Sequence, residues 1–257
     1  MRGPVTVSGV SLSGRLHHIT GTVQPGSVTH ILGQNGAGKS TLLQIIGGLM
    51  QPDTGGVRIA SQNLLSMSLG ELADFRCFHA QHAVIPFGLK VNEYLHFYSG
   101  DDNEGVRALA QPARLDIAHL LARRLNTLSG GEQQRVNIVR ALAQCWRQLK
   151  NGTALVVLDE PLQGLDIRHQ LSLCALCNDL ASQGNTLIIS CHDIQLSANH
   201  AHFIWLLKRG ELHFDGEVKH VINVANLTAT FGCDFAISKM QNDYQISAKA
   251  PIEARDL

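Results

Sequence analysis

Residues 33–40 read GQNGAGKS, a glycine-rich turn of the type that binds phosphate groups. The turn follows an apolar segment, residues 27–32, which predicts a buried strand, and it opens a segment with helical spacing, KSTLLQIIGGL. Glycines let the backbone wrap a triphosphate, while Lys39 reaches the β and γ phosphates and Ser40 ligates Mg²⁺. The predicted nucleotide-binding residues of this loop are Gly33, Gln34, Asn35, Gly36, Ala37, Gly38, Lys39, Ser40 and Thr41.

Two adjacent carboxylates, Asp159 and Glu160, end the apolar segment ALVVLDEP. Parallel sheets bind ligands at the carboxyl edge of their strands, so this pair is predicted near the glycine-rich turn. Asp159 is predicted to hold Mg²⁺, directly or through water. Glu160 is predicted to orient and deprotonate an attacking water, which a hydrolase needs and a kinase does not. The alternative is an acid pair that only complements the dipole of a following helix.

His192 follows the next expected strand, in the segment IISCHD, so its imidazole is predicted at the same sheet edge. An imidazole there can contact a γ phosphate and sense whether that group is present. A histidine at a strand end is by itself usually structural. The neighbouring turn and carboxylates are what favour a catalytic role.

A second glycine-rich segment, LSGGEQQR at residues 128–135, resembles another anion cradle far downstream of the first. Its hydroxyl and bare backbone N–H groups precede a helix with a regular apolar face. Because the first loop already supplies the N–H groups that a triphosphate uses, we expect the second segment to bind the nucleotide of another copy of the chain. Two copies arranged head to tail would then enclose two ATP molecules. The residues concerned are Ser129, Gly130 and Gly131.

The elements that must position these residues alternate between strands and helices. That alternation predicts an α/β fold with a mainly parallel sheet covered on both faces. The segment from residue 239 onward is polar and weakly patterned, and we expect a frayed or family-variable end. Strands are expected at 27–32, 56–60, 154–158 and 186–190, helices at 91–100, 117–126, 132–149 and 167–182, and a terminal hairpin at 204–217.

Composition narrows the function classes. The chain has 257 residues, of which 44% are hydrophobic and 16% are charged, enough to bury the core of one domain. Lys plus Arg and Asp plus Glu number 21 each, which argues against nucleic acid as the main partner. The apolar runs are too short to cross a bilayer, so we expect a soluble, cytoplasmic chain. Its six cysteines are expected to be thiols, with Cys174 and Cys177 in a helical core position rather than a metal site.

These motifs, in this order, resemble the ATP-binding subunit of an ABC transporter over nearly the whole chain. The order is P-loop (residues 33–41), a Q-loop glutamine, Gln81, in FHAQH, the signature segment (residues 128–135), the Walker B strand LVVLDEP, a D-loop QGLD with Asp166, and the switch histidine His192. The resemblance implies that Gln81 binds Mg²⁺ and links the γ phosphate to a helical subdomain, and that Asp166 helps couple two nucleotide sites.

The resemblance also implies a fold, cofactors and partners. It implies a P-loop NTPase fold over residues 1–257, with a small antiparallel β part and an inserted helical subdomain at about residues 89–148. It implies ATP and Mg²⁺ as cofactors, a second copy of the chain, and two membrane permease subunits. A periplasmic binding protein would take part indirectly. The implied location is the cytoplasmic face of the bacterial inner membrane.

One feature departs from the family pattern. Family members usually carry an aromatic residue before the P-loop that stacks on adenine, and VSLSGRLHHITGTVQPG has none at that place. Arg15 or His17 could stack on the base through a planar guanidinium or imidazole face. Weaker adenine contacts are the other interpretation.

The cargo is suggested by segments outside the nucleotide site. GRLHHITGTV, HDIQLSANHAHFIWLLKRGEL and NLTATFGCDF are similar to the ATPases of bacterial vitamin B12 importers. Importers of haem and iron–siderophores share almost every motif and are the alternatives. A soluble ABC ATPase of protein assembly is a further hypothesis, whereas a P-loop kinase or GTPase would leave the signature segment and His192 unexplained.

Overall fold

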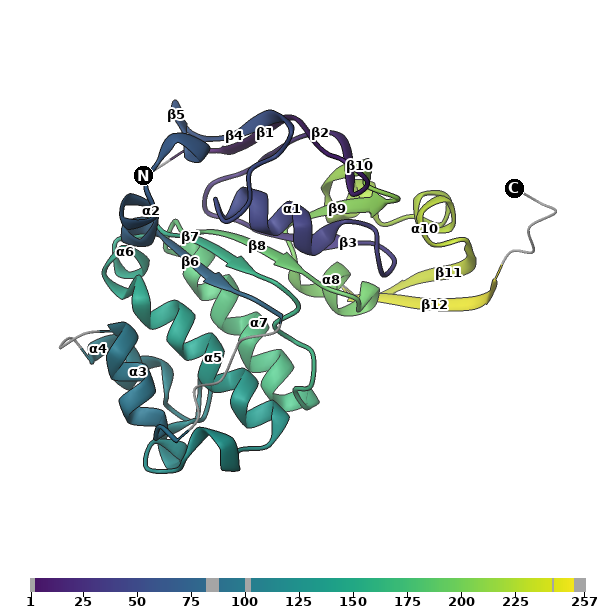
Figure 1. Cartoon of the computed structure of the whole chain (residues 1–257). Helices are drawn as coiled ribbons and strands as arrows, with labels where there is room; N and C mark the ends of the chain where they lie inside the picture. Colours follow the sequence, from purple (N-terminus) through teal and green to yellow (C-terminus); the bar gives the residue numbers. More distant parts are fainter. Residues whose placement is uncertain (1–2, 82–87, 100–102, 242, 252–257) are drawn as a thin grey trace.

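The computed structural model describes residues 3–81, 88–99, 103–241 and 243–251. A six-stranded sheet crosses the molecule, with a four-stranded antiparallel sheet on one side and a group of helices on the other (Figure 1). The strands are β1 (Val5–Leu12), β2 (Leu16–Val23), β3 (Val28–Leu32), β4 (Thr54–Ile59), β5 (Gln62–Asn63), β6 (Arg76–His79), β7 (Leu155–Leu158), β8 (Thr186–Ser190), β9 (Phe203–Lys208), β10 (Glu211–Glu217), β11 (Cys233–Met240) and β12 (Asp243–Pro251). The α-helices are α1 (Lys39–Ile46), α2 (Leu69–Phe75), α3 (Val91–Ser99), α4 (Glu104–Leu109), α5 (Gly130–Gln144), α6 (Trp146–Lys150), α7 (Ile167–Ser182), α8 (Ile194–His200), α9 (Val218–Val221) and α10 (Val224–Phe231).

The six-stranded sheet has the order β10-β9-β3-β8-β7-β6. The strands β6, β7, β8, β3 and β9 are parallel, and β10 is antiparallel to β9. Every residue of β3, β7 and β8 is buried, as expected for strands covered on both faces. The predicted α/β class with a mainly parallel sheet is confirmed.

Helix α1 packs between the two sheets. Its apolar residues lie in one buried cluster with side chains of β1, β2 and β4 on one side and of β7 and β8 on the other. The expected strand at 56–60 is β4, which belongs to the antiparallel sheet rather than to the core sheet. The P-loop helix is therefore held on both of its long faces. Its fully buried side chains are Leu42, Leu43, Ile45 and Ile46.

On the other side of the core sheet, α3, α4, α5 and α7 share a second buried cluster. The helix expected at 132–149 is two helices, α5 and α6, separated at Cys145, whose ψ of 33° departs from helical geometry. The predicted helix at 91–100 is α3, and the one at 167–182 is α7. On α7, Cys174 and Cys177 are buried, and all six cysteines are free thiols.

The helix expected at 117–126 is wrong. This segment instead forms two 3₁₀ turns, Ala118–Leu120 and Leu125–Thr127. Its backbone pairs with the chain before α3, because Leu125 N–H donates to the oxygen of Leu89 and the Arg123 oxygen accepts from Val91. Those bonds use groups that a helix would bond internally, while its leucines still reach the core.

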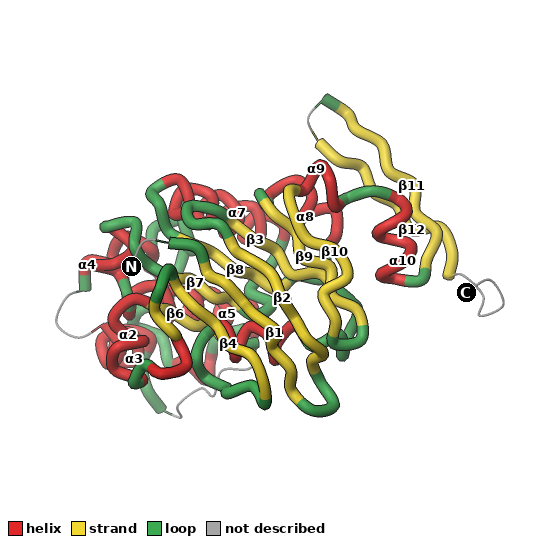
Figure 2. The backbone as a smooth tube through the Cα atoms, turned by 90° about the horizontal axis from the view of Figure 1, so that it is seen from above, coloured by secondary structure: helices red, strands yellow, loops and turns green. Residues whose placement is uncertain are grey.

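The frayed end expected from residue 239 is also wrong for the described part. The strands β11 and β12 form an antiparallel hairpin that projects from the body of the molecule (Figure 2). The hairpin is attached to α8 because Asn199 donates to the backbone oxygen of Tyr244 at 3.2 Å and accepts from its N–H at 2.7 Å. Tyr244 is 7% exposed, so a polar sequence still supplies one anchoring side chain. Residues 252–257 of that prediction lie outside the described residues.

Candidate active site

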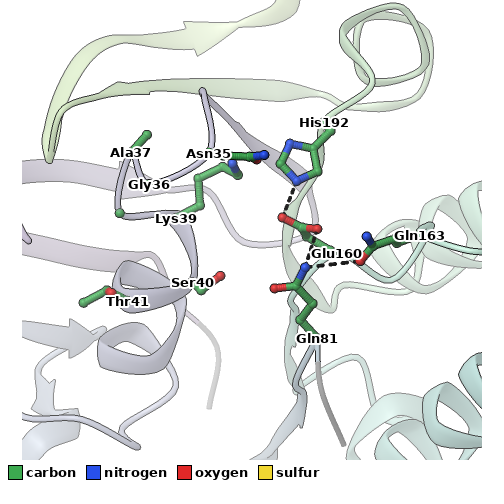
Figure 3. A pocket seen from close by; sticks show the side chains of 11 residues that line it. Asn35, Gly36, Ala37, Lys39, Ser40, Thr41, Gln81, Glu160, Gln163 and His192 are labelled. Atoms are coloured by element: carbon green, nitrogen blue, oxygen red, sulfur yellow. Dashed lines mark hydrogen bonds and ion pairs between the residues drawn. The ribbon is translucent and has the colours of Figure 1, made fainter.

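A cavity of about 350 Å³ opens at the carboxyl edge of the core sheet. Four segments surround it: the loop between β3 and α1, and the chain that follows β6, β7 and β8 (Figure 3). Adjacent parallel strands bring segments from distant parts of the sequence to this edge. The lining residues are Asn35, Gly36, Ala37, Gly38, Lys39, Ser40, Thr41, Gln81, Glu160, Gln163 and His192.

The P-loop can bind an anion through its backbone. Gly36 and Gly38 have φ of 79° and 102°, in the region that side chains other than glycine avoid. A Cβ on Gly38 would lie 2.6 Å from the side chain of Leu16, so the turn also depends on close packing. Helix α1 begins after Gly38 with no side-chain cap and no acidic residue in its first turn. Its first N–H groups and the positive end of its dipole therefore face the cavity.

Lys39 is buried at the base of the loop, with 5% of the residue exposed. Its Nζ donates to the backbone oxygens of Gly33 at 2.8 Å and Gln34 at 3.2 Å. Burial lowers the pKa of the Lys39 ammonium below its ordinary value, and the nearby Glu160 and Asp159 carboxylates act in the opposite direction. The ammonium is thus held beside the cavity by neutral carbonyl groups that phosphate oxygens can replace as acceptors.

Asp159 lies beneath the cavity, with 3% of the residue exposed. Its Oδ1 accepts from Ser190 Oγ at 2.7 Å and from Ser40 Oγ at 3.1 Å. The hydroxyl and carboxylate oxygens of Ser40 and Asp159 are hard donors, as Mg²⁺ prefers. Figure 3 shows the amide oxygen of Gln81 on the side of Ser40. The three side chains together offer a donor set that fits Mg²⁺.

The fit of this site to Mg²⁺ depends on oxygen atoms of different chemical types: hydroxyl, carboxylate and amide. Among the described residues, no group of three His, Cys, Asp or Glu side chains could hold a metal ion. A cation at Ser40 and Asp159 would therefore complete its coordination with amide, water or phosphate oxygens.

Glu160 is the centre of a hydrogen-bonded group inside the cavity. Its Oε2 accepts from Gln81 Nε2 at 2.8 Å, and its Oε1 pairs with His192 Nε2, so the carboxylate lies between the other two side chains (Figure 3). Glu160 has a φ of 48°, a backbone conformation that costs roughly 1–3 kcal/mol for a residue with a side chain. Its N–H donates to Ser190 Oγ at 2.8 Å, which helps to hold that conformation.

The sequence prediction missed two members of this group. Ser190 links the Asp159 carboxylate to the backbone of Glu160, because its hydroxyl donates to Asp159 and accepts from the Glu160 N–H. Gln163 accepts from Gln81 at 3.2 Å and lines the cavity. A serine at the end of the apolar segment LIIS was the available signal for Ser190. Gln163 is the first residue of the D-loop segment QGLD, but its place in the cavity depends on the turn after β7.

The residues predicted for the signature segment do not line this cavity. Ser129 caps α5 in a capping box, with Glu132 N–H donating to Ser129 Oγ at 3.3 Å and Ser129 N–H donating to Glu132 at 2.7 Å. A Cβ on Gly130 would meet nothing within 4 Å. Ser129 and Gly130 are exposed, so this helix start lies at the surface and outside the cavity of the same chain. Asp166, also outside the cavity lining, caps α7 through the N–H of His169.

The two residues suggested for base stacking lie beside the P-loop. Both Arg15 and His17 are exposed. A Cβ on Gly38 would be 3.1 Å from the Arg15 backbone oxygen, and His17 N–H donates to Gly210 at 2.8 Å. Gly210 N–H in turn donates to the oxygen of Ala37, so the backbone of both residues lies beside the P-loop.

Comparison with known proteins agrees with these motifs. The family model described as ABC transporter matches residues 16–163. The hemin import ATP-binding protein of Rhodopseudomonas palustris strain BisB5 is 38% identical over 220 residues, which cover 84% of each chain. The vitamin B12 import ATP-binding protein of Escherichia coli O45:K1 is 35% identical over 226 residues, which cover 88% of this chain and 90% of the relative.

Solved structures are similar over most of the chain. A metal-chelate type ABC transporter in an inward-facing conformation has a TM-score of 0.76 over 98% of both chains, and at 22% identity this likeness concerns the fold alone. A dimeric bacterial ABC transporter cassette is 26% identical, with a TM-score of 0.71 over 83% of this chain and 98% of that one. Within the described residues, no helix is both long and apolar enough to cross a membrane.

Proposed function

This chain belongs to the ABC transporter family as an ATPase subunit of the importer type, and from that premise we propose that it powers the uptake of vitamin B12. The proposal includes a head-to-tail dimer, two permease subunits, and a location at the cytoplasmic face of the bacterial inner membrane. A periplasmic binding protein would deliver the cargo to the permease. The cargo would then never touch this chain.

The observation that carries the proposed hydrolysis is the position of Glu160. Its carboxylate is in the cavity, held between Gln81 and His192, while Asp159 is directed toward Ser40. A carboxylate within the cavity can accept a proton from a water molecule that attacks the γ phosphate. A residue used only to complement a helix dipole would not need a left-handed backbone or two side-chain partners.

Each side chain then has a separate role. The P-loop N–H groups and Lys39 would bind the β and γ phosphates, with Lys39 exchanging its carbonyl acceptors for phosphate oxygens. Ser40, Asp159 and Gln81 would hold Mg²⁺, whose charge offsets that of the phosphates. Gln81 and His192 would orient the Glu160 carboxylate, and His192 would also contact the γ phosphate.

The dimer is proposed because the signature segment is remote from the cavity of its own chain. Ser129, Gly130 and Gly131 would donate to the nucleotide bound by the other copy, and Asp166 would contribute at the same interface. A similar cassette, 28% identical with a TM-score of 0.70, is described as a dimer in a post-hydrolysis state bound to ADP and Pi. That likeness supports the same arrangement here.

Support for vitamin B12 comes from the relative in Escherichia coli and from the segments GRLHHITGTV and NLTATFGCDF. Hemin is the second candidate, because the hemin import relative is 38% identical. Iron–siderophores and a soluble role in protein assembly are further alternatives. The nucleotide site cannot separate these cargoes because it contacts only ATP.

The test is reconstitution of the chain in proteoliposomes with the permease encoded beside it. We expect binding protein loaded with cobalamin to stimulate ATP hydrolysis and uptake of labelled cobalamin, and Lys39→Ala to remove both. If only a hemin or siderophore carrier stimulated hydrolysis, the chain would still be an importer ATPase, but vitamin B12 would be the wrong cargo. ATP hydrolysis that responds to no carrier, from a chain that does not copurify with membranes, would favour the assembly factor.

A further inference from the structure

The start of α5 contacts the segment from the end of β7 to the first turn of α7 at three points. Gln134 Nε2 donates to the backbone oxygens of Glu160 and Pro161, each at 3.2 Å. A Cβ on Gly131 would lie 2.8 Å from the carbonyl oxygen of Gly164, so only glycine permits this approach. The signature segment and the D-loop of one chain are thus packed against each other, although they are far apart in the sequence.

The third contact is a pair of buried side chains. Nη1 of Arg135, the last residue of the signature segment, lies 2.9 Å from His169 Nδ1 and is in contact with His169 Nε2. His169 Nδ1 lies 2.8 Å from Asp166 Oδ1, and its backbone N–H donates to the same oxygen at 2.9 Å. Arg135 is 7% exposed and His169 is 8% exposed. The imidazole therefore joins the D-loop carboxylate to the signature helix.

The chemistry of the three groups assigns the roles of the ring nitrogens. The Arg135 guanidinium only donates, and the ionised Asp166 carboxylate only accepts. A neutral imidazole that donates from Nδ1 to Asp166 and accepts from Arg135 at Nε2 satisfies both partners. Bonds from the backbone and side chain of His169 lower the pKa of Asp166, which keeps the carboxylate ionised.

A second carboxylate joins this group from the helical side. Asp116 Oδ2 lies 3.8 Å from His169 Nε2 and 3.6 Å from Arg168 Nη1. Asp116 has a φ of 48°, so its backbone also adopts a conformation that costs energy. His169 consequently lies where α7, the signature helix and the loop before the first 3₁₀ turn meet.

We propose that His169 is a positioning residue that holds Asp166 and Arg135 in one fixed arrangement. This inference rests on the proposed function, because the N–H groups at residues 129–131 and Asp166 would act on a nucleotide shared with a second copy. Without the imidazole link, the Asp166 carboxylate would no longer be fixed to the signature helix, and only the contacts of Gln134 and Gly131 would hold the two segments together. The affinity of the P-loop for ATP would not change, whereas closure of the dimer would weaken.

The experiment compares His169→Leu with His169→Gln in the Glu160→Gln background, which should hold the ATP-bound dimer. The two replacements are similar in size, but only glutamine can donate to Asp166 and accept from Arg135. We expect His169→Leu to weaken ATP-dependent dimerisation about tenfold or more, the effect of losing a buried bond to a charged group. His169→Gln should recover most of that loss. ATP affinity of the monomer, measured with a fluorescent analogue, should stay within twofold in both variants.

A second variant removes the same contact between Arg135 and His169 by changing the arginine. Arg135→Met keeps an unbranched apolar stem but removes the guanidinium and its donors, and we expect the same loss of dimerisation with the same monomer affinity. It serves in place of His169→Leu should that protein not fold. Thermal unfolding of each monomer checks the fold.

The outcomes separate the inference from the proposed function. If the Glu160→Gln protein, with His169 unchanged, stays monomeric with ATP, both the dimer proposal and this inference are wrong. Should it dimerise, and His169→Leu or a folded Arg135→Met dimerise equally well, only the inference is overturned. Equal losses in His169→Leu and His169→Gln would also overturn it, because packing rather than hydrogen bonding would be the cause.

Discussion

The P-loop (residues 33–41) and the signature segment (residues 128–135) both place glycines at the start of a helix, yet they differ in what surrounds them. The P-loop faces Glu160 and His192 across a cavity, and its helix is packed between two sheets. Gly130 of the signature segment faces open space. The P-loop thus has Glu160 and His192 opposite it, whereas the signature segment lies outside that cavity.

The difference teaches that a helix start alone does not make a site. Helix α2 begins with a capping box of Ser68 and Glu71, the same motif that Ser129 and Glu132 form at α5. In α5 two glycines follow the cap, whereas α2 has Leu69 and then Gly70. Contact with the D-loop, through Gly131 and Gln134, is what distinguishes the start of α5 from that of α2. Experiments that separate binding from hydrolysis can test whether the two cradles have different tasks.

The largest effect is expected from Glu160→Gln, which removes the proton acceptor beside the P-loop. General-base catalysis contributes roughly 10²–10⁴-fold, so we expect kcat to fall by about that factor. ATP binding should persist, and the dimer should stay closed because the second cradle is intact. Steady-state ATP hydrolysis and sedimentation with ATP measure the two properties. Glu211→Gln, which changes a carboxylate that is 59% exposed, is the control. Hydrolysis by Glu160→Gln at the parental rate would refute this choice of general base.

A smaller effect is expected from Gly130→Ala, which tests the second cradle. The added Cβ meets nothing in the chain, so the free energy of unfolding should change by less than about 1 kcal/mol. In the dimer, the methyl group would face the partner's phosphates, and we expect ATP-dependent association to weaken about tenfold or more.

Gly70→Ala is the matched control for that variant, because Gly70 also lies at a helix start within a capping box. The atom nearest to a Cβ added at Gly70 is Ser68 Oγ, at 4.0 Å. Association should be unchanged in this variant. Equal association by Gly130→Ala and the parent would mean that the second cradle does not bind the partner's nucleotide.

The last prediction concerns the stability in acid of the core sheet that supports the P-loop, and it has the least bearing on the comparison of the two glycine-rich segments. Burial lowers the pKa of His30, on β3, to about 3 and that of His79, on β6, to about 4, with nearby positive groups adding to the shift. The unfolded chain binds a proton at each residue near pH 6.5, whereas the folded chain does not. Stability is therefore complete above pH 6.5 and should fall as the pH drops toward 4.

The expected slope is about 1.4 kcal/mol per pH unit for each histidine within that window. Urea titrations at pH 7, 6 and 5 measure it. His79→Met, which removes one titrating group from the core sheet, should reduce the slope by about that amount per unit. An unchanged slope in His79→Met would show that this residue does not contribute.

Prediction from sequence was most successful where the local structure depends on residues that are close in the sequence. The five-residue strands β3 and β8 and the helix α7 are continuous apolar or periodic segments, and their bounds agree closely with expectation. The prediction of a helix at 117–126 was wrong because Leu121, Arg123 and Leu125 form backbone bonds with residues 89–92, 29 or more residues away. Similarly, β12 depends on pairing with β11 and on Tyr244, which its polar sequence did not indicate.

The candidate active site also has features that the sequence predicts and features that depend on the tertiary structure. The amino-acid sequence by itself determined which groups are present: a phosphate loop with Lys39, a carboxylate pair at a strand end, and a second glycine segment at another helix start. Only the tertiary structure decided their distances, because the strand order β3-β8-β7-β6 brings Ser40, Asp159 and Gln81 to one edge. It also decided that the signature segment lies away from the cavity of its own chain. Hydrogen bonds between strand ends require neighbours in space, and the order of strands in a sheet differs from their order in the chain.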